Sequence, residues 1–282
     1  GSGLVGSEMC IRDRFNVGTV IGIYISGTTV GGLFGRLVVS AITDFVSWRM
    51  GLIVIGILYL AVGIAFFMLL PKPKYQRQRQ SGGLQLIKTF HTALANKKLL
   101  WIYLVAFLIM GSFVAVFNFI SYVLLAPPYS LSQTVVGLLF VVYLFGTFSS
   151  TYMGRLSDQH GNGRVLILGL LIMLTGGLLT LLQPLVFKFI GLAIFTFGML
   201  GSHSVACGWV GKLNQGDKAQ SSSMYMFFYY AGASSLGTLG GVFLESYGWS
   251  GVIGMVAAAV IICLLVVVRL ELAVRQHLLW HH

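Results

Sequence analysis

Charged residues are scarce in this sequence, and their scarcity decides the class of protein. Only 9% of the 282 residues are Asp, Glu, Lys or Arg, whereas 57% are hydrophobic and the mean hydropathy is +0.89. A soluble globular domain carries about 25% charged residues. A chain this poor in charge cannot cover a surface that faces water, so we predict that lipid solvates most of it.

Cysteine is also rare. The three cysteines are Cys10, Cys207 and Cys263, and the last two lie in apolar runs, where cysteine acts as a small hydrophobic residue. Three scattered thiols exclude a disulfide scaffold. Histidines and carboxylates do not recur at the spacing of metal ligands. We therefore expect no metal site and no cofactor.

The few charges that exist are mostly basic, with a net charge of +11. A basic protein can bind nucleic acid, but here the Lys and Arg residues lie between apolar runs rather than on one polar face. This distribution is typical of a membrane protein that orients itself by its basic loops. We expect a lipid bilayer as the partner and no nucleic acid.

Long apolar windows dominate the chain. A transmembrane helix needs about 20 apolar residues, and β-barrel strands would be shorter and would alternate in polarity. The windows free of Asp, Glu, Lys and Arg are Phe15–Gly35, Met50–Pro71, Leu99–Gly154, Val165–Phe187, Phe189–Gly211, Ala219–Leu244 and Ser246–Val268. The third window is long enough for two helices and is broken by Pro127 and Pro128. We predict an all-α polytopic membrane protein with eight transmembrane helices.

The loops between these windows differ in charge. One alternate set of loops holds 13 Lys and Arg, and the other holds three. The first set comprises Lys72–Lys98, Arg155–Arg164, Lys212–Lys218 and the tail from Arg269, and the second contains Arg36, Arg49 and Lys188. Because basic loops stay in the cytoplasm, we predict a cytoplasmic C-terminus and a location in a bacterial inner membrane.

Two pairs of predicted helices resemble each other. Gly27-x3-Gly31-Gly32-Leu33-Phe34-Gly35 precedes Trp48, and Gly237-x2-Gly240-Gly241-Val242-Phe243 precedes Trp249. Transporters are commonly built from internal repeats. In the second half of the chain, four predicted helices precede the glycine-rich helix. In the first half, no predicted helix precedes the glycine-rich helix. We therefore expect that four N-terminal helices are missing and that the parent protein has twelve.

These considerations divide the chain into five parts. We expect a non-native stretch at 1–14, because Met9-Cys10-Ile11-Arg12-Asp13 resembles the translated end of a transposon used in sequencing-library preparation. The alternative is a genuine short cytoplasmic tail. Two helices of an N-terminal half follow at 15–70, and a basic cytoplasmic linker at 71–98. A six-helix C-terminal half occupies 99–272, and a cytoplasmic tail 273–282.

One predicted loop carries a distinctive motif, Gly154-Arg155-Leu156-Ser157-Asp158-Gln159-His160-Gly161-Asn162-Gly163-Arg164. Its glycines permit a tight turn, and Asp158 can cap a helix or pair with Arg155 or Arg164. The segment resembles the cytoplasmic loop motif G-x-L-a-D-r-x-G-r-k of the major facilitator superfamily. The resemblance points to Gly154, Arg155, Asp158, Gly161 and Arg164 as its functional positions, and Gln159 and Asn162 replace the usual basic residues.

The first glycine-rich segment resembles the fifth helix of superfamily antiporters, without the usual proline. Its motif residues are Gly27, Gly31, Gly32, Gly35 and Arg36. A stripe of small residues favours close helix packing, and the resemblance adds a seal between the two halves of an antiporter. From Phe15 onward the chain is similar to the efflux branch of YnfM-like and arabinose-efflux-permease-like transporters.

This resemblance implies a fold and an activity. The fold would be a fragment of the major facilitator fold, equivalent to helices 5–12 of 12. The activity of the parent would be proton-coupled efflux of a drug, sugar or metabolite by alternating access, performed by a monomer. We expect that the fragment alone does not transport. The alternatives from other classes are a membrane-embedded enzyme and a non-transporting scaffold. We do not expect an enzyme, because His203 is not accompanied by the nucleophile or metal ligands of a catalytic site.

Polar residues inside the windows are the candidates for a substrate path. His203 is the only ionisable residue deep inside a predicted helix, where such groups are costly and often functional. It could bind substrate or carry a proton, or it could be a neutral histidine bonded to a neighbouring helix. The resemblance implies that two further predicted helices, one with Asn118 and one within 219–244, face a central cavity. Their polar or aromatic candidates are Asn118, Tyr225, Tyr229, Tyr230 and Ser234, with Ser235 beside them.

Overall fold

The computed structural model describes residues 17–45, 47–69, 96–213 and 218–279. These residues are helical apart from short turns, and no strand occurs among them. The helices are α2 (Val17–Phe45), α3 (Trp48–Leu69), α5 (Lys97–Leu125), α6 (Gln133–Leu138), the 3-10 helix η1 (Leu139–Val142), α7 (Tyr143–His160), α8 (Asn162–Leu179), α9 (Leu185–Leu213) and α10 (Lys218–Leu279). The predicted all-α fold class is confirmed.

The helices follow the apolar windows, although α2 continues to Phe45, ten residues past the window that ends at Gly35. α6, η1 and α7 continue one another along a single path, and α10 consists of two helices, 218–247 and 249–279, that meet at Gly248. Gly248 has φ +64°, which glycine adopts without a Cβ clash, so the chain reverses there. Among the described residues, five helices, counting α10 as one, are long and apolar enough to cross a membrane. The number of eight crossings stays a prediction.

Local sequence signals set the helix ends. The side chain of Asn96 accepts a hydrogen bond from the amide of Lys98 at 3.1 Å and begins α5, as an N-cap residue does. α5 ends at Leu125, immediately before the turn with Pro127 and Pro128, as predicted.

One predicted boundary is wrong. The turn between α8 and α9 lies at 180–184, around Pro184, rather than at Lys188. Proline lacks an amide hydrogen and stops a helix, whereas a single lysine can remain inside one. Lys188 therefore lies in the first turn of α9, with only 4% of its surface exposed.

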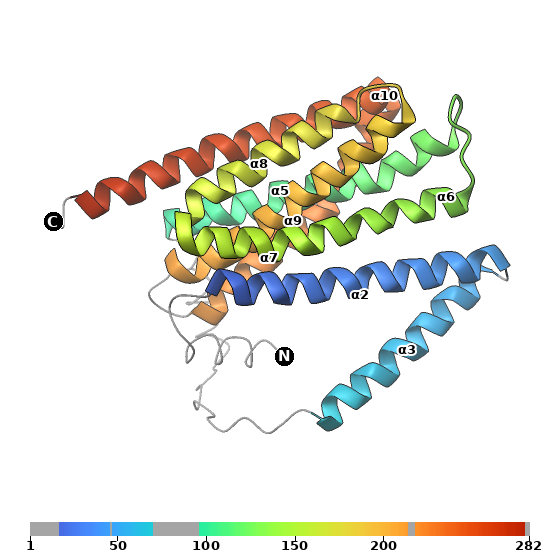
Figure 1. The fold of residues 1–282 in the computed structure, drawn as a ribbon, viewed down its shortest axis with the longest axis horizontal. Coiled ribbons are helices and arrows are strands. Elements are labelled where there is room, and N and C mark those ends of the chain that lie inside the picture. The colour runs from blue at the N-terminus through green and yellow to red at the C-terminus, as the bar shows by residue number, and fades with distance from the viewer. Residues whose placement is uncertain (1–16, 46, 70–95, 214–217, 280–282) are drawn as a thin grey trace.

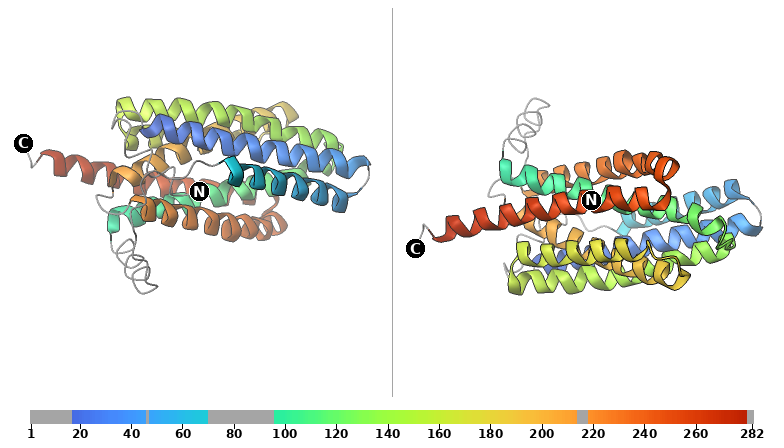
Figure 2. Two further views of the ribbon diagram at one scale, coloured as in Figure 1. Left: turned by 90° about the horizontal axis from the view of Figure 1, so that it is seen from below. Right: turned by 90° about the horizontal axis from the view of Figure 1, so that it is seen from above.

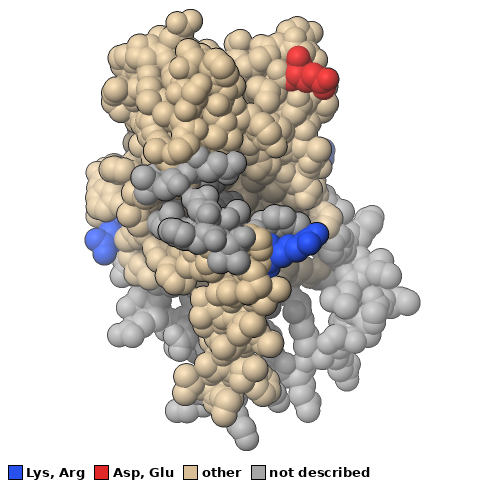
Figure 3. All heavy atoms as spheres, turned by 90° about the vertical axis from the view of Figure 1, so that its right-hand side faces the viewer, with Lys and Arg blue, Asp and Glu red and all other residues tan. Residues whose placement is uncertain are grey.

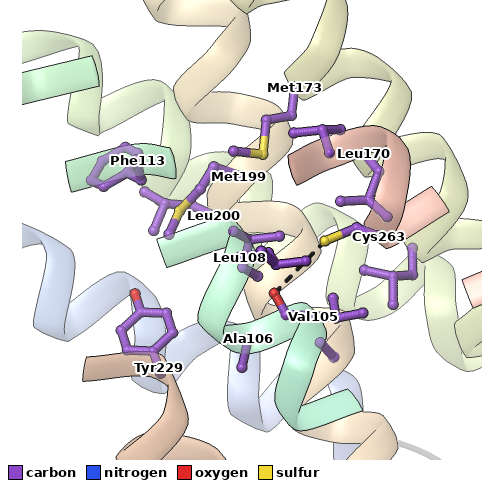
Figure 4. Packing of buried hydrophobic residues seen from close by; sticks show 14 of the residues in the cluster. Val105, Ala106, Leu108, Phe113, Leu170, Met173, Met199, Leu200, Tyr229 and Cys263 are labelled. Atoms are coloured by element: carbon purple, nitrogen blue, oxygen red, sulfur yellow. Dashed lines mark hydrogen bonds between the residues drawn. The ribbon is translucent and has the colours of Figure 1, made fainter. Parts of the chain in front are cut away.

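The helices form a bundle with α5 near its centre. α5 packs along both parts of α10, and α8 packs along α9 (Figures 1 and 2). Figure 4 shows the interior between them, which is filled by residues such as Val105, Leu108, Leu170, Met199 and Cys263. Lipid tails are as apolar as these side chains, so the contacts stabilise the bundle mainly through close packing.

Glycines bring α8 and α9 close enough for backbone contact. A Cβ at Gly176 or Gly198 would collide with backbone atoms of the facing helix, at Phe195 and Met173 respectively. Small residues at such positions are typical of membrane helix pairs. The two helix backbones therefore approach closely at this crossing, on the helix that also carries His203.

α2 lies against α7, whereas α3 leaves the bundle. Figure 1 shows α3 diverging from α2 after the turn between them. At that end of the molecule, viewed in Figure 3, the described surface carries few charged side chains.

Candidate substrate cavity

Five helices surround a cavity of about 510 Å³. A volume of this size lies within the range of about 300–1,000 Å³ that is usual for sites of small organic ligands. The lining residues come from α2 (Tyr24, Ile25, Thr28, Gly32), α5 (Met110, Phe113, Val114, Phe117, Asn118), α7 (Tyr143), α9 (Leu200, His203) and α10 (Met226, Tyr229, Tyr230). The cavity thus joins residues that are up to 206 positions apart in the sequence, from Tyr24 to Tyr230.

Four of the six predicted path residues line this cavity, namely Asn118, His203, Tyr229 and Tyr230. A fifth, Tyr225, does not line the cavity; it is fully buried and its hydroxyl lies within hydrogen-bonding distance of the His203 ring. The sixth, Ser234, lies outside the cavity: it lines a separate pocket of about 400 Å³ on α10, which it shares with Tyr230. Their assignment to a substrate path stays a prediction.

His203 is held in place by two tyrosines of α10. Its ring nitrogen Nδ1 lies 2.9 Å from the hydroxyl of Tyr225, and its ring stacks on Tyr229 with 4.3 Å between centroids. The hydroxyl of Tyr225 also lies 3.4 Å from the carbonyl oxygen of His203. Nδ1 is therefore occupied, and among the residues that the structure describes Nε2 has no hydrogen-bond partner. The histidine is bonded to a neighbouring helix and still lines the cavity, so both interpretations from the sequence describe part of its surroundings.

An aromatic cluster forms another wall, and sequence reasoning missed it. Phe113 and Phe117 of α5 lie 4.7 Å apart between ring centroids, and Tyr143 of α7 meets Phe117 edge-on at 5.0 Å. Edge-on and tilted contacts are favourable for aromatic pairs. In the sequence these residues look like ordinary apolar positions, and only the meeting of α5 with α7 reveals the wall.

The loop motif makes contacts beyond its own loop. The carboxylate of Asp158 accepts a hydrogen bond from the amide of Thr19 at 3.2 Å, and its other oxygen lies 3.4 Å from Nζ of Lys212. Lys212 also donates to the side-chain oxygen of Asn162 at 3.0 Å. A carboxylate at the start of a helix is stabilised by the free amides there, so Asp158 ties α7 to the start of α2. Thr19 and Lys212 had no motif that marked them in the sequence.

The remaining motif positions occupy the same turn. Gly161 has φ +92° between α7 and α8, a conformation that favours glycine. Gly154 is buried, whereas Arg155 and Arg164 are exposed.

The glycine-rich face of α2 is open in the described part of the chain. A Cβ at Gly27, Gly31 or Gly32 would meet no atom within 4 Å, and Gly35 faces the hydroxyl of Tyr59 in α3. The side chain of Arg36 lies outside the described residues. Gly32 lines the cavity, and the role of this face in packing or sealing stays a prediction.

Lys188 was not singled out in the sequence and forms a second polar cluster. Its Nζ donates to the carbonyl oxygen of Thr180 at 2.6 Å and lies 5.9 Å and 6.0 Å from the ring centroids of Tyr129 and Trp249. Trp249 donates to the hydroxyl of Thr180 at 3.1 Å. A buried cation needs partners that replace its hydrating water, and here a carbonyl oxygen and two aromatic faces do so. This cluster joins the ends of α8, α9 and α10, away from the cavity.

Long apolar helices, a cavity among five of them and the Asp158 loop are features of a polytopic membrane protein. The profile of the Major Facilitator Superfamily matches residues 9–126 and 115–278. The chain therefore belongs to the major facilitator superfamily and is a multi-pass membrane protein.

Curated relatives place it more narrowly. It is 40% identical to the uncharacterized MFS-type transporter YybF of Bacillus subtilis (strain 168), over 88% of this chain and 62% of YybF. It is 41% identical to the inner membrane transport protein YnfM of Escherichia coli (strain K12), over 89% of this chain and 60% of YnfM. An uncharacterized transporter of Buchnera aphidicola subsp. Schizaphis graminum is 36% identical over 91% of this chain. The chain spans about three fifths of the length of these relatives.

Proposed function

We propose that this chain provides one side of the substrate path of a secondary active transporter. The observation that carries the proposal is the cavity among α2, α5, α7, α9 and α10, in which Asn118, His203 and Tyr229 meet. Discontinuous or convergent helices around a central site are the usual arrangement in secondary transporters, which move substrates by alternating access.

The proposal includes the direction and the driving force of transport. We assign to the protein the export of a small organic compound in exchange for protons, with the monomer as the working unit. The excess of Lys and Arg in one set of loops supports a cytoplasmic C-terminus in a bacterial inner membrane. The name of YnfM, an inner membrane transport protein, agrees with that location.

Among the described residues that line the cavity, we assign the response to protons to His203, because its imidazole can gain and lose a proton. Its free Nε2 at the cavity could meet substrate and proton alternately, while Tyr225 holds Nδ1. Competition of this kind would couple substrate release to proton binding.

The test is transport into inside-out vesicles that contain the full-length parent of this chain, because we expect that the fragment alone does not transport. A panel of labelled dyes, sugars and amino acids is offered with an imposed pH gradient, and again after an uncoupler has collapsed it. Uptake of one compound class that depends on the gradient is the expected result. Uptake that ignores the uncoupler contradicts proton coupling, and no uptake of any compound by correctly inserted protein contradicts the transporter assignment.

The role of His203 has a matched control in the same chain. His203→Gln removes the titratable ring, whereas His160→Gln changes an exposed histidine at the end of α7, outside the cavity. We expect the first variant to lose the pH dependence of transport and the second to keep it. Wild-type transport with unchanged pH dependence in His203→Gln would refute the assigned role.

A further inference from the structure

The chemistry of the cavity wall restricts what it can hold. Of the fifteen lining residues that the structure describes, none is Asp, Glu, Lys or Arg. An ion that leaves water loses several kcal/mol of hydration unless an opposite charge or several hydrogen bonds replace it. The described wall offers neither a carboxylate to a cation nor a positively charged side chain to an anion. An uncharged ligand escapes this loss.

Aromatic rings could still attract a cation through their faces. Such contacts stabilise a cation by less than the hydration free energy that a buried ammonium loses. At the Lys188 cluster the cation needs both two rings and a carbonyl oxygen. Among the described lining side chains only Asn118 supplies a comparable carbonyl oxygen, and no carboxylate accompanies it.

The wall is also unsuited to a sugar. Eight of the fifteen described lining residues have no nitrogen or oxygen in their side chains: Ile25, Gly32, Met110, Phe113, Val114, Phe117, Leu200 and Met226. A sugar has a hydroxyl on nearly every carbon, and each one placed against these residues would lose a hydrogen bond to water without replacement. The hydroxyl of Thr28 already donates to the carbonyl of Ile25 at 2.8 Å.

Two aromatic surfaces face the space from different helices. One consists of Phe113, Phe117 and Tyr143, and the other is the stack of His203 on Tyr229 with Tyr230 edge-on at 5.4 Å. In Figure 4, Phe113 and Tyr229 project from separate helices, with Leu200 between them. Flat rings gain most from such surfaces, through offset or edge contacts.

The available polar atoms are few and neutral. Among the described residues, Nε2 of His203, the amide of Asn118 and the hydroxyl of Tyr229 have no hydrogen-bond partner. A ligand with one or two neutral polar groups, such as a carboxamide, a ketone or a phenol, can satisfy them. A fully apolar ligand would displace water from them and leave them without hydrogen bonds, which weakens its binding.

We infer that the cavity takes an uncharged, planar aromatic molecule with one or two neutral polar groups. This inference rests on the proposed function, because it names the substrate class of the same site. It excludes sugars, organic anions and organic cations as the main substrates.

The test measures binding to the chain in lipid nanodiscs by isothermal titration calorimetry. The probes share one carbon skeleton: naphthalene-2-carboxamide, naphthalene-2-carboxylate, 2-naphthylmethylammonium and the fully saturated decahydronaphthalene-2-carboxamide, with methyl glucoside as the sugar. Empty nanodiscs correct for partition into lipid. We expect the aromatic carboxamide to bind at least about tenfold more tightly than either ion or the sugar. Saturation of the rings should weaken binding about three- to tenfold.

A pair of variants ties the binding to this cavity. Tyr230 and Tyr122 are exposed to similar extents, 63% and 65%, but only Tyr230 lines the cavity. Tyr230→Leu should weaken binding of the carboxamide about three- to tenfold, and Tyr122→Leu should leave it unchanged. Equal effects of the two changes would overturn the inference, as would tightest binding of an ion, of the sugar or of the saturated probe, or no binding of any probe.

The failure of this inference is distinguishable from the failure of the proposed function. The vesicle assay is repeated with the same five probes in labelled form. Gradient-dependent transport of the sugar or of an ion would overturn the substrate class and uphold the transporter. Binding of the carboxamide without transport of any compound would uphold the class of ligand and count against secondary transport.

Discussion

α3 and α5 are almost equally hydrophobic, but they have opposite surroundings. Their most apolar windows have mean hydropathies of 2.8 and 2.5, yet 0% of the α3 window is buried within the structure and 61% of the α5 window is. In water such a difference would be impossible, because an exposed helix of this composition would aggregate. In a bilayer, lipid solvates both helices equally well. Hydropathy therefore tells which segments enter the membrane and does not tell which of them pack against each other.

Glycine substitutions should show the largest difference between the two environments. A Cβ at Gly232 of α10 would overlap the backbone of Phe107 in α5, whereas a Cβ at Gly63 of α3 would meet nothing within 4 Å. Because a backbone cannot move aside, we expect Gly232→Ala to lower the free energy of unfolding by about 3 kcal/mol. Gly63→Ala should change it by less than about 0.5 kcal/mol.

Steric trapping in bicelles would measure both variants. Equal losses of stability would show that the surface of α3 is packed against something in the bilayer, and the comparison with α5 would then fail.

Truncation of isoleucine gives the next largest effect. Ile109 of α5 is 0% exposed and Ile57 of α3 is 63% exposed. Ile109→Ala removes packing atoms and leaves a void, for which we expect a loss of about 2 kcal/mol, the low end of the range for soluble proteins, since lipid rather than water is the alternative surrounding. Ile57→Ala should leave the unfolding free energy, measured in the same bicelles, within about 0.5 kcal/mol of the wild type. A loss above 2 kcal/mol at Ile57 would contradict the lipid-facing assignment.

Asp158 should contribute less, because it acts at one helix end. Asp158→Ala removes the acceptor for the amide of Thr19 and the ion pair with Lys212. We expect α2 to lose about 1 kcal/mol of local stability in its first turn, detected as faster hydrogen exchange of the Thr19 amide by mass spectrometry.

Lys212→Met is the control for this prediction, since it removes the ion pair and keeps the bond to the amide. If the control accelerated exchange as much as Asp158→Ala, the effect would belong to the ion pair rather than to the helix start.

The smallest effect is predicted where α3 touches α2. A Cβ at Gly35 would overlap only the hydroxyl of Tyr59, the far end of a side chain that is 53% exposed. The tyrosine can rotate away, so Gly35→Ala should cost less than about 0.5 kcal/mol, although the overlap resembles that at Gly232. Thermal denaturation of the two alanine variants side by side would reveal the difference, and similar midpoints would show that α3 is held as firmly as α5.

Much of the architecture followed from local patterns. The apolar windows predicted the helices, Pro127 and Pro128 marked the end of α5, and the Asp158 motif indicated both a helix turn and the superfamily. The apolar windows divide at Lys188, but the turn lies at 180–184, because proline stops a helix and a single lysine does not. Most of the basic linker predicted at 71–98 lies outside the described residues, which resume at Asn96.

The candidate cavity was only partly predictable. His203, Asn118 and two tyrosines were expected there because polar or large amphipathic groups inside apolar helices attract notice. Phe113, Phe117 and Tyr143 were not expected there, because aromatic residues occur in any membrane helix. Ser234 was expected there but lines a different pocket.

The sequence by itself determined the composition-driven properties: membrane embedding, helical structure, the positions of most turns and the family. Each depends on residues close together in the chain, whose hydropathy and backbone preferences act locally. Only the tertiary structure decided that Asp158 reaches Thr19 and Lys212, that Lys188 is enclosed by Tyr129 and Trp249, and which faces of α5, α9 and α10 enclose a cavity. In lipid, these choices depend on how helix surfaces fit together, and shape complementarity between distant segments has no local signature in the sequence.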